Sequence, residues 1–451
     1  MNKYVSEFLE KVCTEVKYKK IHPELSRELQ GHIDELISEY IDKGMSEEEA
    51  STKAVKQMGD PFEIGKELNN THKPKAEWSI IALIIAMISI GGITFFSFYN
   101  SNYIYTSLGN YIAYLSLSII LFTACYLFDY TKIEKYSLHI FILTLISFVF
   151  LLFSPIFTVR VNGVPFLQIG PFTVSLPTIV IPLLLVSFAG LLNKWATGSI
   201  KDMSKLIALA LLSILLFTII PSAANIIILS CSYMVMLSVA IKGKNFKRNS
   251  KKSLIYFWGS TLTLILLSAF SFIVFSPYRV LRLLTFFDPY SNPNGAGYQY
   301  VVLNKLISSS KLFGSSNNLY IRYNGTNQLA LQDLHTELVF TYIVSAFGYI
   351  AGSVVLIIFT LTIIRMFLAT KKIYSYYGKY LASSIVTVFS VQVITNILMN
   401  LGILPIVGIS LPFISYGGSN FMTNMILLGL LLNVYRRKDL VGLLFPVQKK
   451  L

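Results

Sequence analysis

Carboxylates are scarce in most of this chain, and their scarcity limits where acid–base chemistry can occur. Beyond residue 77 there are only seven, namely Asp129, Glu134, Asp202, Asp288, Asp333, Glu337 and Asp439. Asp333 and Glu337 are four residues apart, with His335 between them, directly before a long apolar run. Partial burial at the start of such a run would raise the pKa of Glu337 toward that of a useful general base. A carboxylate that only marks the end of a helix explains the position equally well.

Two arginines and a further carboxylate precede this group. Arg279 and Arg282 are three apart, so they share one face if their segment is helical. Guanidinium groups suit a pyrophosphate, but they also suit anchoring in anionic lipid headgroups, and both interpretations stay open. Asp288 precedes Pro289, a pairing that favours a turn over a catalytic role.

A glycine-rich segment near the C-terminus is the second candidate site. Gly408-Ile-Ser-Leu-Pro-Phe-Ile-Ser-Tyr-Gly-Gly-Ser419 cannot continue a helix through lipid, so it must be buried in protein or line a wet cavity. Its turn, Ser415-Tyr416-Gly417-Gly418-Ser419, offers backbone donors to a sugar or phosphate, or else packs tightly. Gln392, Asn396 and Asn400 recur every fourth residue just before it. Hydrogen bonding between helices is the favoured role of this stripe, ahead of lining a cavity.

The elements that would position these residues are membrane helices. The chain of 451 residues is 54% apolar and only 14% charged, which is a membrane composition. Ten segments are long enough, or nearly so, to cross a bilayer: 78–99, 111–128, 137–157, 178–195, 206–220, 223–241, 253–275, 338–368, 382–405 and 421–435. None contains a carboxylate, which argues against a proton-coupled transporter. We therefore predict an all-α polytopic fold with ten transmembrane helices over residues 76–440.

Basic residues predict the orientation of these helices. Of the 26 lysines and arginines after residue 77, 20 fall in loops on one side of the membrane and 6 on the other. The richer side is the cytoplasmic one, so both termini are expected in the cytoplasm. The same pattern accounts for the net charge of +15 without nucleic-acid binding. On this topology Asp333, His335 and Glu337 lie in a long outward loop, residues 276–337, whose proline and asparagine turns indicate order.

Residues 1–75 have a different composition and predict a small cytoplasmic helical domain. Residues 1–77 hold 12 basic and 16 acidic residues, against 26 and 7 in the remainder. We expect helices over residues 3–16 and 23–41, the second opened by a proline. A third should follow Ser46, because Ser46 and Glu49 have the spacing of a capping box.

Several of these segments together resemble a known family. The flanks Asn396–Pro405 and Met425–Asn433, with Gly408–Ser419 between them, are similar to the C-terminal signature of the FtsW/RodA/SpoVE proteins. These form the SEDS family of bacterial cell-wall glycosyltransferases. The resemblance implies ten transmembrane helices in the bacterial plasma membrane with both termini inside. Residues 1–75 resemble, more loosely, the HAAS-type helical domain that precedes membrane segments in many Gram-positive proteins.

The resemblance also implies roles for the candidate residues. The family's outward loop ends in a His-Thr-Asp-Phe-Ile-Phe motif whose aspartate is the catalytic carboxylate, and this chain has His335-Thr-Glu-Leu-Val-Phe340. Glu337 would deprotonate the 4-hydroxyl of one lipid II molecule for attack on another, while Arg279 and Arg282 offset charge on the leaving pyrophosphate. The residues implied to bind substrate are Arg279, Arg282, Asp288, His335, Ser415, Tyr416, Gly417, Gly418 and Ser419. A class B transpeptidase is the implied partner. A divalent cation, Mg or Mn, stays open, although no metal cluster is suggested by the sequence.

The chain departs from the family at several charged positions. Glutamate lengthens the catalytic arm by one methylene, and a misplacement of about 1 Å can cost roughly a hundredfold in rate. Where the family has Gly-Glu-Glu-Leu-Gly, this chain has Val344-Ser-Ala-Phe-Gly348. Two alternatives to a lipid II polymerase therefore stay open: a non-catalytic scaffold that binds lipid II or recruits the transpeptidase, and a lipid II flippase. Cell division, cell shape and sporulation are all compatible processes.

Overall fold

The structure is a computed structural model, and its contacts divide the chain into two compact units that we describe separately. One contains the N-terminal helices, and the other comprises residues 77–371 and 376–433. The described residues are 3–17, 19–72, 76–100, 108–161, 163–170, 172–196, 200–220, 222–243, 258–259, 277–323 and 326–438.

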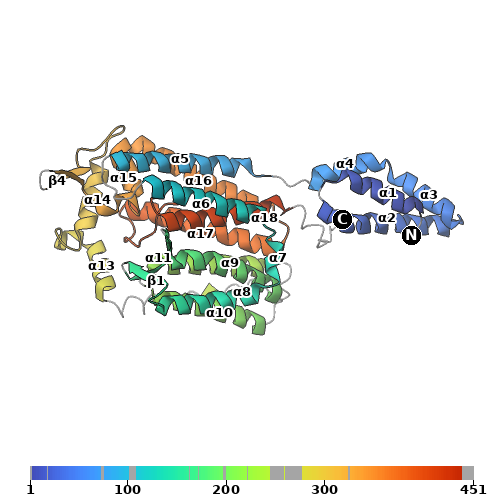
Figure 1. Ribbon diagram of the computed structural model, residues 1–451, viewed down its shortest axis with the longest axis horizontal. Coiled ribbons are helices and arrows are strands. Elements are labelled where there is room, and N and C mark those ends of the chain that lie inside the picture. The colour runs from blue at the N-terminus through green and yellow to red at the C-terminus, as the bar shows by residue number, and fades with distance from the viewer. Residues whose placement is uncertain are drawn as a thin grey trace. The chain divides into compact units, whose positions relative to one another are not determined.

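The N-terminal domain is a cluster of four helices, α1 (Lys3–Glu15), α2 (His22–Asp42), α3 (Glu47–Met58) and α4 (Pro61–His72) (Figure 1). The apolar stripes of α1 and α2 meet in a core that includes the fully buried Val12 and Ile33. The predicted capping box is confirmed, since the Ser46 hydroxyl accepts from the Glu49 amide and the Glu49 carboxylate accepts from the Ser46 amide. The first three helices begin and end within a residue or so of their predicted bounds.

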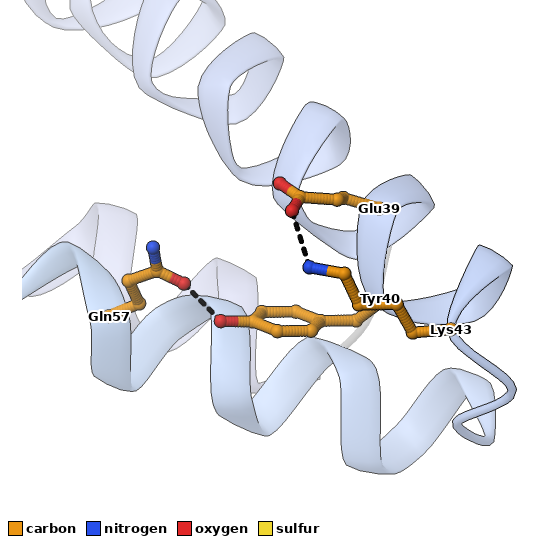
Figure 2. A network of polar contacts seen from close by, with 4 residues as sticks. All are labelled: Glu39, Tyr40, Lys43 and Gln57. Atoms are coloured by element: carbon orange, nitrogen blue, oxygen red, sulfur yellow. Dashed lines mark hydrogen bonds and ion pairs between the residues drawn. The ribbon is translucent and has the colours of Figure 1, made fainter.

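Two polar contacts in this domain lie on its surface. The Lys43 ammonium donates to the Glu39 carboxylate at 2.6 Å, and the Tyr40 hydroxyl donates to the Gln57 side chain of the neighbouring helix (Figure 2). The hydrogen bond from Lys43 lowers the pKa of Glu39. Both partners of the ion pair are exposed to solvent, so their contact orders the end of α2 and stabilises it little.

The second unit is a bundle of long apolar helices. Within the described residues six are long and apolar enough to cross a membrane: α5 (Trp78–Asn100), α6 (Leu108–Leu127), α9 (Leu176–Trp195), α11 (Ala223–Lys242), α16 (Tyr349–Lys371) and α17 (Tyr376–Asn400). The chain is therefore a multi-pass membrane protein. Helices also form at α8 (Ser137–Phe153), α10 (Ile200–Thr218) and α18 (Gly418–Arg436), which match three more predicted spans. The predicted span 253–275 lies outside the described residues apart from positions 258 and 259.

The predicted span 338–368 is wrong as one continuous helix. A short helix, α15 (Val339–Phe347), ends at Gly348, and α16 begins directly after it. Gly348 has φ +99°, and a Cβ there would meet the Leu312 carbonyl oxygen at 2.4 Å. The break therefore depends on glycine and on a close approach of the preceding loop. The predicted span 382–405 is also shortened, because α17 ends at Asn400 and an irregular segment follows as far as α18.

One end of the bundle, which we call the loop end, holds segments that lie between the predicted membrane spans (Figure 1). It contains α13 (Pro277–Phe287), η2 (Pro289–Ser291), α14 (Tyr298–Ser308) and the 3-10 turn η3 (Gln332–His335). Two small antiparallel sheets correct the all-α prediction. The first is β1 (Thr158–Val161), β2 (Val164–Ile169) and β3 (Phe172–Ser175) in that order, and the second pairs β4 (Tyr320–Tyr323) with β5 (Thr326–Leu329).

Candidate active site

A hydrophobic cluster fixes the segment that carries Glu337. Leu334 and Leu338, on either side of it, are buried together with Leu303 of α14, Tyr342 of α15 and Met399 of α17. Glu337 lies in the short turn between η3 and α15. Asp333 and Glu337 therefore do not share the face of one α-helix, as their spacing allowed, because α15 begins only at residue 339.

The turn is closed by backbone and side-chain hydrogen bonds. The amides of Thr336 and Leu338 both donate to the Asp333 carbonyl oxygen, at 3.1 and 3.0 Å. The Asp333 carboxylate accepts from the Gln299 side chain at 3.1 Å. These bonds close the turn and hold the Asp333 carboxylate in place.

The Glu337 side chain is half-buried and electrostatically coupled to its neighbours. The pKa of the Glu337 carboxyl is raised to about 7, mainly by burial and also by the nearby Asp333 carboxylate, while Arg282 acts in the opposite direction. A pKa near neutrality leaves a substantial fraction of the carboxylate ionised at physiological pH while keeping it a stronger base than an exposed glutamate. The predicted partner Arg282 is thus brought to Glu337 from α13, a helix some 50 residues earlier in the chain.

The structure shows no contact of the other two predicted residues of this region, Arg279 and Asp288, with Glu337 among the described side chains. The backbone of Arg279 lies in α13, but its side chain falls outside the described residues. Asp288 follows the end of α13, is exposed, and accepts through its backbone oxygen from the Ser291 hydroxyl at 2.8 Å. This geometry is that of a turn.

The glycine-rich segment lines a pocket beside the turn. The segment is irregular between α17 and α18, as its composition predicted, and the Tyr416 amide donates to the His335 carbonyl oxygen at 2.9 Å. The pocket is partly open, and its space of about 520 Å³ includes open solvent. Its lining is Gly91, Thr94, Phe95, Phe98, Tyr111, Tyr114, Leu115, His335, Val339, Phe413, Ile414, Ser415, Tyr416, Gly417, Gly418 and Phe421. His335 and Val339 lie on either side of Glu337 in sequence, whereas the Glu337 side chain does not itself line this pocket.

Of the predicted turn residues, Ser419 alone does not line the pocket. Its hydroxyl accepts from the Ser175 amide at 3.0 Å and donates to the Thr173 carbonyl oxygen at 3.2 Å. Ser419 therefore ties the start of α18 to β3. Gly418 packs against α6, since a Cβ there would meet the Tyr114 ring at 2.3 Å.

Metal ligation has no support in this part of the chain. The described residues contain no group of three histidine, cysteine, aspartate or glutamate side chains able to hold a metal ion. The donor set around Glu337 is a pair of carboxylates with an arginine, and a guanidinium competes with a cation for that pair. We therefore assign no catalytic step to a metal ion.

Comparison with known proteins identifies the family. The family model of the FtsW/RodA/SpoVE cell cycle proteins matches residues 76–440. The chain belongs to the FtsW/RodA/SpoVE family. The match covers the whole bundle and the loop end, so Glu337, Arg282 and the glycine-rich segment all lie within it.

Relatives of the family extend the comparison along the chain. A probable peptidoglycan glycosyltransferase FtsW of Wigglesworthia glossinidia brevipalpis is 29% identical over 354 residues, covering 76% of this chain and 87% of the relative. The stage V sporulation protein E of Bacillus subtilis is 31% identical over 176 residues, covering 39% of this chain and 47% of the relative. The peptidoglycan glycosyltransferase RodA of Treponema pallidum is 30% identical over 165 residues, covering 37% of each chain.

Two solved structures share the fold of this FtsW/RodA/SpoVE member. A chain of a peptidoglycan synthase complex, described for its coordination of polymerization and crosslinking, superposes with a TM-score of 0.65 at 20% identity. That match covers 80% of this chain and 98% of the other. The rod shape determining protein RodA of Thermus thermophilus superposes with a TM-score of 0.56 at 17% identity, covering 80% and 97%.

Sequence reasoning missed three residues that contact Glu337 or its surroundings. Asn396 and Asn400 donate to the Glu337 carbonyl oxygen at 2.7 and 3.1 Å. Their fourfold spacing predicted hydrogen bonds between helices. Asn400 makes such bonds with Thr341 of α15, whereas Asn396 bonds the turn at Glu337 and the irregular segment at Ile409. Gly408 lies against the Glu337 carboxyl: a Cβ at Gly408 would be 3.1 Å from Oε1. A lone glycine between two apolar residues carried no signal of that contact.

Proposed function

We propose that this protein is a peptidoglycan glycosyltransferase that polymerises lipid II on the outer face of the bacterial plasma membrane. Its family and its named relatives support this activity. The observation that carries the proposal is the half-buried Glu337 carboxyl, whose pKa of about 7 suits a general base, placed beside Arg282 at the loop end.

In the proposed reaction Glu337 moves one proton. Its carboxylate takes the proton from the 4-hydroxyl of the acceptor sugar, and that oxygen attacks the anomeric carbon of the donor. A new glycosidic bond forms as the bond to undecaprenyl pyrophosphate breaks, and the pyrophosphate leaves with the electron pair. Arg282 offsets the negative charge that develops on the leaving group, with Arg279 as a second cation on the same helix. Asp288 shapes the turn after that helix.

The pocket lined by His335 and the glycine-rich turn is the proposed sugar site. Tyr111, Tyr114 and Tyr416 line it with aromatic rings, which suit the apolar face of a pyranose. The Tyr114 hydroxyl is itself bonded to the Thr173 backbone. The pocket is lined by residues two before and two after Glu337, which supports delivery of a sugar hydroxyl to the carboxylate.

Orientation and partner follow from the same proposal. The excess of basic residues in the loops at the opposite end from α13–α15 supports cytoplasmic termini and an outward-facing site. The structural neighbour that combines polymerization and crosslinking supports a class B transpeptidase as partner. The N-terminal domain, residues 1–75, is proposed as a cytoplasmic docking module of the HAAS type.

A non-catalytic scaffold is the second candidate. It is favoured by glutamate at the position where the family motif has aspartate, together with the uncharged residues over Val344–Phe347. This scaffold would hold lipid II in the same pocket without transferring it.

The test is glycan polymerisation by the purified full-length protein in liposomes, with and without its transpeptidase. Lipid II is the substrate, and glycan strands are resolved on a gel. We expect polymer from the wild type and none above background from Glu337→Gln. Asp202→Asn is the matched control, because Asp202 pairs with Lys205 on α10 and takes no part in the site. A wild type that binds lipid II but forms no strands, even with its partner, would favour the scaffold.

A further inference from the structure

Asn396 and Asn400 are fully buried on the last turns of α17, directly beneath the turn that carries Glu337. Both hydrogens of the Asn396 amide are used, since Nδ2 donates to the Glu337 carbonyl oxygen at 2.7 Å and to the Ile409 carbonyl oxygen at 2.6 Å. One side chain thus joins two segments that are more than 70 residues apart in sequence. A buried amide with both donors engaged holds its partners in one geometry.

Asn400 supports this arrangement from one turn further along the helix. Its Nδ2 donates to the Glu337 carbonyl oxygen at 3.1 Å and lies 3.1 Å from Asn396 Oδ1. Its Oδ1 accepts from the amide and the hydroxyl of Thr341, at 3.0 and 2.7 Å. The Thr341 amide belongs to the first turn of α15, where backbone donors have no partner inside the helix. Asn400 therefore caps the helix that follows Glu337.

The position of the carboxylate depends on both segments that Asn396 joins. One of the two carbonyl groups that Asn396 binds belongs to Glu337 itself, and the other belongs to Ile409. The Glu337 carboxyl lies against Gly408, the residue before Ile409. Gly408 has φ +75°, a backbone conformation natural to glycine, and its missing side chain leaves the space that the carboxyl occupies. A shift of one segment relative to the other would therefore change the position of the Glu337 carboxylate relative to Gly408.

We propose that Asn396, steadied by Asn400, is a positioning residue that fixes the Glu337 carboxylate by clamping its backbone to the segment beside Gly408. The clamp acts on geometry and touches no substrate. Its catalytic consequence rests on the proposed function, because it matters for rate only if Glu337 is the base.

A second buried asparagine provides the matched control. Asn433 of α18 is also fully buried, and its Nδ2 donates to the carbonyl oxygens of Cys125 and Phe128 at the end of α6. Asn433→Leu therefore removes a comparable pair of buried hydrogen bonds from the same unit without touching the turn of Glu337. A merely structural role of Asn396 predicts equal effects of the two substitutions.

The experiment compares Asn396→Leu, Asn400→Leu and Asn433→Leu in the full-length protein with its transpeptidase. We expect Asn396→Leu to lower kcat for lipid II polymerisation by roughly ten- to a hundredfold, the scale of a displacement near 1 Å. KM should stay within about twofold, because no substrate contact is removed. Asn400→Leu should lower kcat less, since both Asn396 bonds remain. Equal kcat values for Asn396→Leu and Asn433→Leu would overturn the proposal.

A second readout needs no activity and keeps the two proposals separable. Labelling of Glu337 by a water-soluble carbodiimide, followed across pH by peptide mass spectrometry, reports the environment of its carboxyl. We expect the midpoint of labelling near pH 7 in the wild type and in Asn433→Leu, and a midpoint nearer 4.5 in Asn396→Leu. An unchanged midpoint in Asn396→Leu overturns the clamp whether or not the wild type polymerises. If Asn396→Leu does not fold, Thr341→Val, which removes only the hydroxyl bond to Asn400, takes its place with a smaller expected shift.

Discussion

The N-terminal domain and the loop end use polar side chains in opposite ways. In the N-terminal domain the ion pair of Glu39 with Lys43 lies at the surface, outside an apolar core. At the loop end Asn396 and Asn400 are fully buried and hold the backbone on either side of the Glu337 carboxyl. An exposed pair can be lost with little change in free energy, whereas a buried donor left without its partner costs about 1–3 kcal/mol.

The difference between exposed and buried polar contacts predicts which substitutions affect local stability and which affect function. Contacts of the first kind order a helix end and affect only their own surroundings. Contacts of the second kind are expensive to leave incomplete, and here they set the position of a candidate catalytic group. Substitutions at the loop end should therefore change rate, and those in the N-terminal domain should change only local stability.

The largest expected effect is the loss of the Glu337 carboxylate. Glu337→Gln keeps the shape of the side chain but cannot accept a proton, so the polymerisation rate should fall by about 10²- to 10⁴-fold. The wild-type rate should itself fall about tenfold for each pH unit below 7, because the pKa of Glu337 is about 7 and only the ionised form is a base. Initial rates from pH 5 to 9 check both, and a flat profile would remove Glu337 from the role of base.

The same carboxyl should make stability and activity respond to pH in opposite directions. Burial raises its pKa from 4.5 to about 7, so between these values the folded protein keeps a proton that the unfolded chain has released. The contribution of Glu337 to the free energy of unfolding should therefore be largest below pH 4.5. It should decline by about 3 kcal/mol as the pH rises to 7. Glu337→Gln has no such proton to lose.

We accordingly expect Glu337→Gln to be more stable than the wild type above pH 7 and closer to it at pH 5. Thermal unfolding in detergent at both pH values measures the difference. A wild type that is the more stable protein at pH 8 would contradict the sign of the shift.

The fold could be predicted from sequence more fully than the site, for a physical reason. Apolar runs such as 78–99 and 223–241 identify helices because lipid demands them. The break at Gly348 escaped prediction because the apolar run continues across it, and only the approach of Leu312 shows why glycine is needed. At the site, the sparse carboxylates limited the outward acids to Asp288, Asp333 and Glu337, and the family resemblance then selected Glu337, but the partner of Asn396 lies 59 residues away in the chain. Contacts of that range follow from packing and leave no local pattern.

Gly408 and Gly314 offer a smaller and cleaner test of the loop end. Both have φ near +80°, at +75° and +81°, so alanine at either should cost about 1 kcal/mol in backbone strain. Only Gly408 faces Glu337: its Cβ would lie 3.1 Å from Oε1, whereas nothing lies within 4 Å of a Cβ at Gly314. Gly408→Ala should therefore also slow polymerisation by about tenfold, through displacement of the carboxylate.

Thermal unfolding and initial rates of the two alanine variants separate strain from contact. Equal losses of stability with a loss of rate only in Gly408→Ala are expected. If both variants keep the wild-type rate, the Glu337 carboxyl tolerates displacement, and the contact with Gly408 has no role in catalysis.

The smallest effect is expected in the N-terminal domain, at the capping box of α3. Ser46→Ala removes the acceptor of the Glu49 amide and the partner of the Glu49 carboxylate, which should cost about 1 kcal/mol. Because these groups are exposed, water replaces the lost bonds and the effect should stay within the domain. Hydrogen exchange read by mass spectrometry should show faster exchange in α3 and none of it in α15 or α17, with an unchanged polymerisation rate. A fall in rate from Ser46→Ala alone would mean that the two regions are coupled, and that the stability of α3 itself acts on the Glu337 site.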